Sequence, residues 1–216
     1  MFLNERIVFM PPKVKFQKEE IVAAALEVVR KKGIDAVTAR EVAAELGVSP
    51  RPIFTWFTTM EQLKVEVYAM AKGRYQAYIE TGLKGPVPFL GVGQQYICFA
   101  KEEPELYKLL FLTKPDEAVG GAMDALHFSQ ELVRESIMRI YHMDAATADK
   151  YFRNLWLVAF SFATLIVTDD CPYTDAQMSA VFTEMSLAYC KAFKEVPGFA
   201  TGEFDKDAIF GALVKK

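Results

Sequence analysis

The amino-acid sequence predicts an all-α protein. Apolar residues recur at the three- and four-residue spacing of an amphipathic helix along most of the chain, whereas the alternation typical of strands is scarce. Residues that cap or stop helices, chiefly Thr, Ser, Pro and Gly, separate these periodic segments. Hydrophobic residues make up 52% of the 216 residues, which excludes a disordered chain and suggests apolar surface beyond one core, such as a subunit interface or a cavity.

Charge and composition exclude further classes of protein. The 25 Lys and Arg residues against 28 Asp and Glu residues give a net charge of −3, which argues against a strongly basic protein that coats nucleic acid. The longest apolar run, Leu155 to Val167, is shorter than the about 20 residues of a membrane-spanning helix, so we expect no membrane association. Cys98, Cys171 and Cys190 are odd in number and far apart, which favours a cytoplasmic protein without disulfide bonds or a zinc cluster.

Two capped helices are predicted at the N-terminal end. The first runs from about Lys18 to Lys32 with one apolar stripe, and Gly33 stops it. The second begins after Thr38, whose hydroxyl can accept a free N–H group while Glu41, three residues on, reaches back. Gly47 ends this helix because glycine readily adopts the left-handed backbone conformation.

A short third helix and a longer fourth helix follow. Ser49 supplies a cap and Pro50 the first residue of the third helix, whose inner face we expect to consist of Ile53, Phe54 and Phe57. Thr59 caps the fourth helix, which runs to about Thr81. After a break, five more helices are predicted at about residues 89–102, 105–111, 117–141, 144–168 and 174–195, with a last turn or two at 206–214.

The segment from Thr38 to Phe57 has the proportions of a helix-turn-helix motif. It consists of a helix of about eight residues, a Gly47-Val48-Ser49 turn and a second short helix, which in this motif enters the major groove of DNA. Ala43 and Ala44 are small enough to let the two helices approach closely. Short helical hairpins occur in many helical proteins, so the spacing by itself leaves the function open.

Residues Gln17 to Leu63 resemble the DNA-binding domain of the TetR family of bacterial transcriptional regulators. The resemblance rests on the first helix ending at Gly33 and on four short motifs: Thr38-x-Arg40-Glu41-Val42-Ala43, Gly47-Val48-Ser49, Trp56-Phe57 and Glu61-x-Leu63. It implies an all-helical homodimer. Residues 1–59 would form an N-terminal arm and a three-helix helix-turn-helix domain, residues 60–82 a connecting helix, and residues 83–216 a helical bundle for ligand binding and dimerisation.

The resemblance also implies a function. The protein would be a ligand-responsive regulator, most simply a repressor that binds a pseudo-palindromic operator in double-stranded DNA and is released by a small apolar or aromatic effector. Arg51 would contact a guanine, and Trp56 has packing in the core as an alternative role. The residues expected at the DNA are Thr38, Arg40, Ser49, Pro50, Arg51, Pro52, Thr55, Trp56 and Lys64.

Three departures from the family pattern put phosphate contacts in doubt. Phe54 stands where a Tyr is usual, Met60 stands where a Lys is common, and Pro52 adds a second proline to the recognition helix. Lys64, one turn beyond Met60, would compensate for the missing cation. An N-terminal arm carrying Lys13 and Lys15 would offer further contacts, although solvated charges on that arm are the favoured alternative for both lysines.

Two sets of apolar side chains are candidates for the regulatory half. The first set would line an effector pocket, with ordinary core packing as the alternative: Phe89, Tyr96, Phe99, Phe111, Met123, His127, Phe128 and Phe160. The second set lies on the two most apolar helices and would form a four-helix dimer interface, with burial inside one chain as the alternative: Leu155, Trp156, Phe162, Ile166, Phe182, Met185 and Tyr189. Only two histidines are present, at no metal-binding spacing, and we expect no cofactor.

Two other functions remain open. An enzyme that acts on an apolar molecule is one, but no nucleophile–histidine–acid order, phosphate loop or metal-spaced cluster supports it. The other is a helical protein–protein adaptor whose helical hairpin no longer binds DNA. The departures from the family pattern at Phe54, Met60 and Pro52 give this alternative some support. Salt-dependent binding to duplex DNA separates the regulator from the adaptor.

Overall fold

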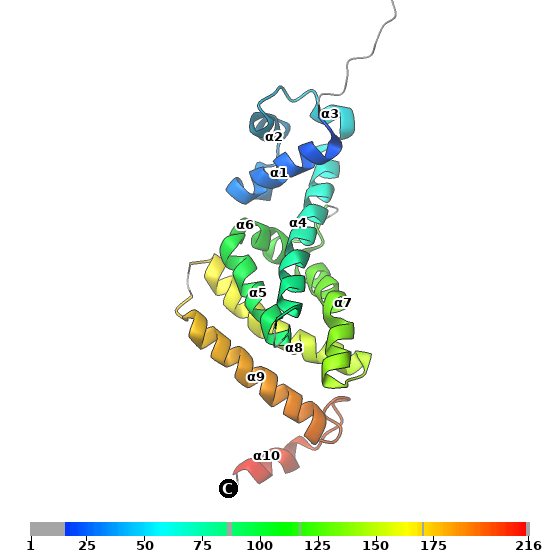
Figure 1. Cartoon of the computed structure of the whole chain (residues 1–216), viewed down its shortest axis with the longest axis vertical. Helices are drawn as coiled ribbons and strands as arrows, with labels where there is room; N and C mark the ends of the chain where they lie inside the picture. Colours follow the sequence, from blue (N-terminus) through cyan, green and yellow to red (C-terminus); the bar gives the residue numbers. More distant parts are fainter. Residues whose placement is uncertain (1–15, 86–87, 117, 170, 215–216) are drawn as a thin grey trace, which may run out of the picture.

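A computed structural model of the chain describes residues 16–85, 88–116, 118–169 and 171–214, with the side chains of all of these except Pro88 and Phe89. These residues form helices joined by turns, and no strand occurs among them, which confirms the all-α prediction. The three N-terminal helices lie at one end of an elongated molecule and the last helix lies at the other end (Figure 1). Lys13 and Lys15 fall outside the described residues.

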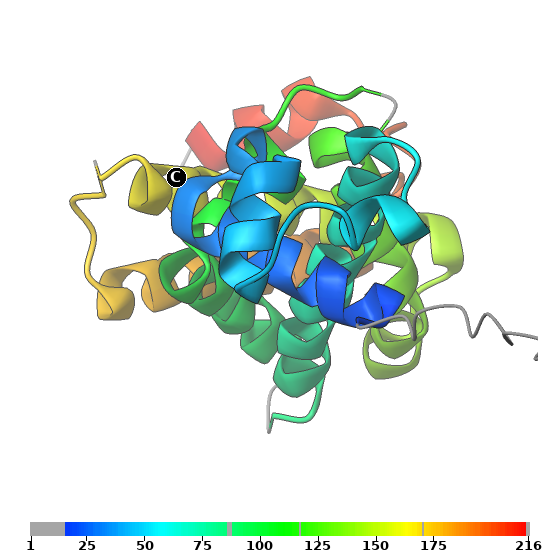
Figure 2. The same ribbon diagram turned by 90° about the horizontal axis from the view of Figure 1, so that it is seen from above.

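The N-terminal helices are α1 (Lys18–Lys32), α2 (Ala39–Leu46) and α3 (Ile53–Trp56), and the bounds of the first two match those predicted from the caps. A 3₁₀ turn, Ile34–Ala36, links α1 to α2. Figure 2 looks down on this end of the molecule, where the three helices lie over the rest of the chain. Their shared core is almost fully buried and includes Ile21, Ala25, Val42, Ile53 and Phe57.

The turn after α2 has the hydrogen bonds of a glycine-terminated helix. Gly47 has a φ of 68° and a ψ of 34°, which is the left-handed region that favours glycine. The N–H of Val48 donates to the carbonyl oxygen of Ala43 at 2.9 Å, and the N–H of Gly47 donates to that of Ala44 at 3.1 Å. These bonds satisfy the last carbonyl groups of α2 and fix the direction in which the chain leaves it.

The third helix begins later than the sequence indicated. Its first residue is Ile53 and not Pro50. The two prolines, Pro50 and Pro52, lack the N–H groups that would join the helical ladder, and Arg51 is disfavoured in a helix because it precedes a proline. The N–H of Ile53 instead donates to the carbonyl oxygen of Pro50 at 3.1 Å, so residues 50–53 form a turn before the helix.

The inner face of α3 is also narrower than expected. Ile53 and Phe57, one helical turn apart, are buried, but the Phe54 side chain is 53% exposed. The prediction that Phe54 packs inward is therefore wrong. The physical reason is the helical period, which places a residue adjacent to Ile53 about 100° away from it around the helix axis.

The connecting helix α4 (Met60–Leu83) begins beside α3 and runs into the bundle, where it packs on α5 (Pro88–Glu102) (Figure 1). Thr59 caps it by accepting the N–H of Gln62 at 3.3 Å, as its sequence predicts. The two helices come very close where Gly82 faces Gly91. A Cβ atom on Gly82 would lie 2.6 Å from the carbonyl group of Gly91, so this crossing requires glycine.

The remaining helices differ from the prediction at two points. The helix expected over residues 105–111 starts as α6 (Pro104–Tyr107) and continues as a wider π-helical turn, Lys108–Leu112. The next helix starts at Gly121, later than the predicted residue 117, because the carboxylate of Asp116 accepts the N–H groups of Ala118 and Val119 in a turn. This helix, α7 (Gly121–Tyr141), ends at the predicted residue. The bounds of the last three helices agree with the predicted ones within a residue or two: α8 (Ala145–Val167), α9 (Asp175–Glu195) and α10 (Lys206–Val214).

The bundle has a buried centre and an open outer side. Helix α8 packs against α5, α7 and α9 and buries side chains along its whole length, from Ala148 to Val167. Helix α9 lies along the outside of the bundle (Figure 1) and buries only Met178 and Phe182 of its 21 residues. Helix α10 buries none. Among the described residues, no helix combines the length and apolar character needed to cross a membrane.

Candidate nucleic-acid interface and ligand cavity

The residues expected at the DNA lie on the surface around α2 and α3. Seven of them are exposed, and Pro52 and Lys64 are half-buried. Thr38 caps α2, its hydroxyl oxygen accepting the N–H of Glu41 at 3.2 Å, so the remaining free N–H groups at this helix end point outward. The exposed ones are Thr38, Arg40, Ser49, Pro50, Arg51, Thr55 and Trp56.

Ion pairs separate the cations of the N-terminal helices into two groups. Lys18 pairs with Glu66, Lys31 with Glu45, and Lys32 with Glu41, at N–O distances of 2.5 to 2.6 Å. The hydrogen bond from Lys32 also lowers the pKa of the Glu41 carboxyl group. The cations without an ion-pair partner among the described residues include Arg40, Arg51 and Lys64. These charges are therefore available to phosphate oxygens or base edges.

The indole of Trp56 is fixed by the segment that precedes α1. Its Nε1–H donates to the carbonyl oxygen of Phe16 at 2.9 Å, while the side chain stays 41% exposed. Trp56 is thus not a core residue. Its N–H is already used within the chain, so any contact with DNA would be made by the exposed part of the ring.

Phe54 is a surface residue that the sequence reasoning missed. Its ring is more exposed than that of Trp56, and both stand on the four-residue helix α3. The signal that could have found it is the spacing of Ile53 and Phe57, which already completes the inner face of so short a helix.

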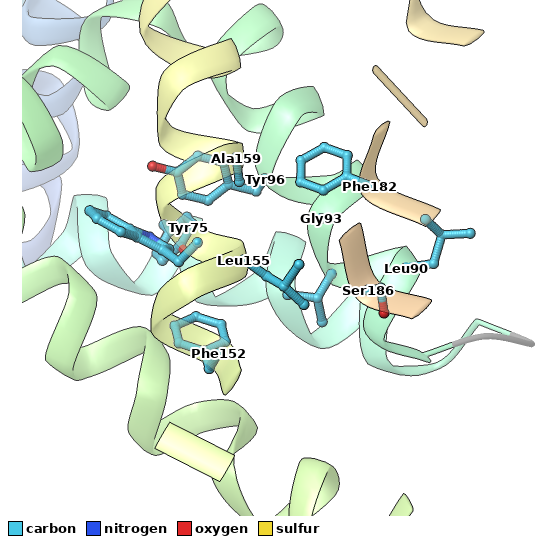
Figure 3. A pocket seen from close by; sticks show the side chains of 11 residues that line it. Tyr75, Leu90, Gly93, Tyr96, Phe152, Leu155, Ala159, Phe182 and Ser186 are labelled. Atoms are coloured by element: carbon cyan, nitrogen blue, oxygen red, sulfur yellow. The ribbon is translucent and has the colours of Figure 1, made fainter. Parts of the chain in front are cut away.

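A narrow cavity lies between α4, α5, α8 and α9 (Figure 3). Its volume is about 40 Å³. The rings of Tyr96, Phe152 and Phe182 and the side chain of Leu155 surround it. The complete lining consists of Tyr75, Leu90, Val92, Gly93, Tyr96, Phe152, Leu155, Trp156, Ala159, Phe182 and Ser186.

The predicted pocket residues only partly coincide with this lining. Tyr96 lines the cavity, whereas Phe99, Phe111 and Phe160 lie behind it in ring contact with Tyr75, Tyr96 or Trp156. The expectation for Met123 and His127 is wrong for this cavity, because both are exposed on α7. Phe128 lies elsewhere, with the Lys72 ammonium 4.6 Å from its ring centre. The side chain of Phe89 is outside the described residues.

Several residues predicted for the dimer interface are buried inside the single chain. Leu155, Trp156 and Phe182 line the cavity, and Phe162 packs on Phe182 with ring centres 5.8 Å apart. Because α8 is surrounded by α5, α7 and α9, many of its large apolar side chains are covered before any partner arrives, although Leu157 is 52% exposed. Only Ile166, Met185 and Tyr189 of the predicted set stay partly exposed.

The hydroxyl groups of the cavity wall are paired within the protein. Tyr75 shares a hydrogen bond of 2.9 Å with Ser129, Tyr96 donates to Tyr107 at 3.3 Å, and Ser186 shares one of 2.7 Å with Tyr151. Burial raises the pKa of the Tyr75 and Tyr96 hydroxyl groups, so both stay neutral. The indole Nε1–H of Trp156 is buried and has no hydrogen-bond partner among the described residues.

A second hollow of about 270 Å³ lies beside the cavity, between α5 and α9. Phe182 belongs to the lining of both. An ion pair between Lys101 and Asp175 joins the two helices there. Burial and a hydrogen bond to Glu102 raise the pKa of the Cys98 thiol in the same wall. In the described parts of the chain, no three His, Cys, Asp or Glu side chains are grouped so as to hold a metal ion.

Comparison with known proteins agrees with this architecture. Residues 21–67 match the family model described as "Bacterial regulatory proteins, tetR family". No curated protein matches the sequence significantly. Among solved structures, a TetR-family transcriptional regulator from Streptomyces coelicolor superposes with a TM-score of 0.63 at 18% identity, over 92% of this chain and 94% of the other.

Two further structures share the fold at low identity. The fatty acid degradation regulator FadR from Bacillus halodurans has a TM-score of 0.55 at 16% identity, over 81% of this chain and 98% of its own. The repressor AlkX from Dietzia sp. strain DQ12-45-1b, implicated in n-alkane biodegradation, has a TM-score of 0.51 at 13% identity, over 82% and 97%. At these identities the likeness concerns the fold.

Proposed function

Because the chain is a TetR-family DNA-binding transcriptional regulator, and this family is not one of enzymes, we propose that it acts in the cytoplasm as an effector-released repressor. In this proposal residues 1–59 bind the operator and residues 83–216 bind the effector and dimerise. Residues 60–82 form the helix that connects these two parts. The observation that carries it is the continuity of α4, whose first turn adjoins α3 and whose Tyr75 lines the cavity.

The DNA contacts in this proposal come from unpaired cations and helix ends. Arg51 precedes α3 in an exposed turn and would reach a guanine edge in the major groove. Arg40 in the first turn of α2 would contact a base edge or a phosphate, and the free N–H groups beside Thr38 would hold a phosphate. Lys64 in α4 would supply the cation that Met60 does not. The remaining members of the predicted set, Ser49, Pro50, Pro52, Thr55 and Trp56, would complete the contact surface.

Dimerisation would use the outer side of α9. Helix α9 carries many apolar side chains, yet only two of its 21 residues are buried. Leu187, for example, is 63% exposed. Met185 and Tyr189 are partly exposed on the same helix. A two-fold dimer through this surface would place two recognition helices on successive major grooves, about 34–36 Å apart.

Effector release would act through the cavity wall. A small apolar or aromatic molecule that widens the cavity must displace side chains of α4, α5, α8 or α9, and α4 transmits its displacement to α3. A coupling free energy of about 1–3 kcal/mol, or 5- to 150-fold in DNA affinity, is enough for such a switch.

The test is footprinting of the purified protein on the DNA upstream of its own gene, with and without apolar aromatic compounds. We expect protection of a pseudo-palindrome, an affinity that falls steeply with salt, and loss of protection with an effector. If the protein binds no duplex DNA in a salt-dependent manner, the adaptor alternative, for which the exposed Phe54 offers an apolar contact, replaces this proposal.

A further inference from the structure

The helix-turn-helix domain is attached to the bundle at a second point besides α4. We propose that Glu103 is a positioning residue for operator binding: its carboxylate holds α1 at a fixed angle to the bundle, and this angle makes the dimer select one distance between operator half-sites. The inference rests on the proposed binding of an operator by a dimer. It goes further by naming the residue that restricts the accepted half-site spacing.

The first step is the ion pair itself. The Glu103 side chain is 3% exposed and accepts hydrogen bonds from Arg30 at 2.6 and 3.0 Å and from Arg74 at 2.6 Å. Arg30 belongs to the last turn of α1, and Arg74 belongs to α4. Among the ion pairs between described side chains, the Arg30–Glu103 pair alone joins residues 16–59 to residues beyond α4.

The second step is the firm hold of the bundle on Glu103. Its N–H donates to the carbonyl oxygen of Phe99 at 2.8 Å, and its own carbonyl oxygen accepts the N–H of Tyr107 at 2.8 Å. Phe99 and Tyr107 are fully buried, and Pro104 further restricts the backbone of the residue that precedes it. The carboxylate is therefore fixed to the core of the bundle and cannot move without it.

The third step is the hold on α1, which is fastened at both ends. Near its start, Lys18 pairs with Glu66 of α4 at 2.5 Å. At its other end it packs on α6 (Figure 1), where a Cβ atom on Gly33 would lie 3.1 Å from the carboxylate of Glu105. Because α1, α2 and α3 share one buried core, the angle of α1 sets the direction of the recognition helix α3.

The fourth step is the leverage of α4. Met60 begins this helix beside α3, and the rise of about 1.5 Å per residue places Met60 about 21 Å from Arg74 along the axis. A tilt of about 10° at Arg74 would therefore move α3 by about 4 Å, which exceeds the rise of about 3.4 Å between base pairs. So small a tilt changes the half-site spacing by a base pair, and the Glu103 link opposes it.

The experiment measures half-site spacing directly. The probes are duplexes that carry the footprinted operator, unaltered or with one base pair inserted or removed at its symmetry centre, and fluorescence anisotropy gives the affinities at one fixed salt concentration. The unaltered protein should bind the altered duplexes about 5- to 150-fold more weakly, which is the worth of one misplaced base contact. In Glu103→Gln this ratio should shrink by at least about 2-fold, the lower limit for coupling between contacting residues.

Three further variants separate positioning from a general loss of stability. Arg30→Gln breaks the same link from its more exposed side, so it should shrink the ratio equally and serves if Glu103→Gln does not fold. The double variant should do no more than either single one. Asp149→Asn removes an ion pair with Arg134 inside the bundle and should leave the ratio unchanged.

A measurement without DNA tests the angle itself. Spin labels on Ser49→Cys and Glu135→Cys, with the three native cysteines replaced by serine, report the distance between the α2–α3 turn and α7 by double electron–electron resonance. An excess of unlabelled protein restricts the signal to one chain. The distance distribution should be narrow in the otherwise unaltered protein and in Asp149→Asn, and broader in Glu103→Gln.

The outcomes distinguish this inference from the proposed function. If the unaltered protein binds no pseudo-palindrome, the proposed function fails, and the claim about spacing fails with it. If it binds one, a spacing ratio that Glu103→Gln leaves unchanged, an equal effect of Asp149→Asn, or a distance distribution that does not broaden overturns the role of Glu103 alone.

Discussion

The carboxylate of Glu103 forms a two-point ion pair with the guanidinium group of Arg30, with hydrogen bonds of 2.6 and 3.0 Å. Glu103 stands between α5 and α6, Arg30 in the last turn of α1, and Arg74 of α4 donates to the same carboxylate at 2.6 Å. Hydrogen bonds to Glu103 and Glu27 raise the pKa of Arg30 further above its ordinary value. One carboxylate, 3% exposed, therefore joins the N-terminal helices to the bundle.

Glu103→Gln should lower the free energy of unfolding by about 1–3 kcal/mol, because two arginines lose a buried charged partner but can still reach water. Urea denaturation followed by circular dichroism measures this. Glu105→Gln is the matched control, since its pair with Lys108 is partly exposed and should be worth less than about 1 kcal/mol. Equal losses of unfolding free energy for the two variants would show that the Glu103 ion pairs stabilise the fold no more than an exposed pair does.

Arg51→Ala should reduce affinity for the operator by about 5- to 150-fold, the loss expected for one bidentate base contact, and should spare binding to unrelated DNA. Fluorescence anisotropy with both duplexes measures this. Arg139→Ala removes an exposed arginine from α7 and should change neither affinity. An equal loss on both duplexes would make Arg51 a phosphate contact instead.

Phe54→Ala should change the free energy of unfolding by no more than about 0.5 kcal/mol, because the Phe54 ring is exposed. Phe57→Ala, three residues away, should cost about 3–5 kcal/mol because it leaves a cavity in the N-terminal core. Urea midpoints of the two variants test the assignment. Comparable destabilisation would mean that Phe54 packs inward.

Leu187→Glu should convert a dimer into a folded monomer, since it places a charge on the proposed interface. Size-exclusion chromatography with light scattering gives the mass, and far-ultraviolet circular dichroism checks the helices. Met123→Glu is matched in exposure, 59% against 63%, but lies on α7 and should leave the mass unchanged. An unaltered mass for Leu187→Glu would place the interface elsewhere.

Asp124→Asn should lower the melting temperature at neutral pH but not in acid. Burial alone would raise the pKa of Asp124, but hydrogen bonds from Lys72 and Tyr68 outweigh it and lower the pKa below its ordinary 3.8. The ionised carboxylate therefore stabilises the fold above that value, and its contribution is lost as the pH falls through the folded-state pKa. Because Asp124 is partly exposed, the contribution should stay below about 1 kcal/mol.

Thermal melts of Asp124→Asn and the unaltered protein between pH 8 and pH 3 test this. The difference should be constant at and above about pH 5 and shrink below pH 4. Asp35→Asn, in the exposed turn before α2, has no ion pair in the described part of the chain and serves as control. A difference for Asp124→Asn that grows in acid would contradict the assigned direction.

Local signals account for the parts of the fold that were predicted well. Helix caps and glycine stops act through hydrogen bonds and backbone angles within a few residues, so they can be predicted from the sequence. Examples are the caps at Thr38 and Thr59 and the stops at Gly33 and Gly47. Errors arose where local signals compete, as in the Pro50-Arg51-Pro52 turn before α3. Phe54 is hydrophobic but does not pack inward, because the helical period places Ile53 and Phe57 on the inner face of α3 and turns Phe54 away from it.

The sequence by itself determined the helical class, most helix bounds and the helix-turn-helix motif, because these depend on periodicity and on contacts between near neighbours. Only the tertiary structure decided which apolar side chains face the cavity and which face solvent. Helix α8 is apolar nearly all round, so its sequence could not tell that Trp156 and Leu155 would be covered by α5 and α9 and not by a second subunit. The Glu103 link with Arg30 and Arg74 likewise joins residues that are far apart in the chain, and only the packing of α1, α4 and α6 brings them together.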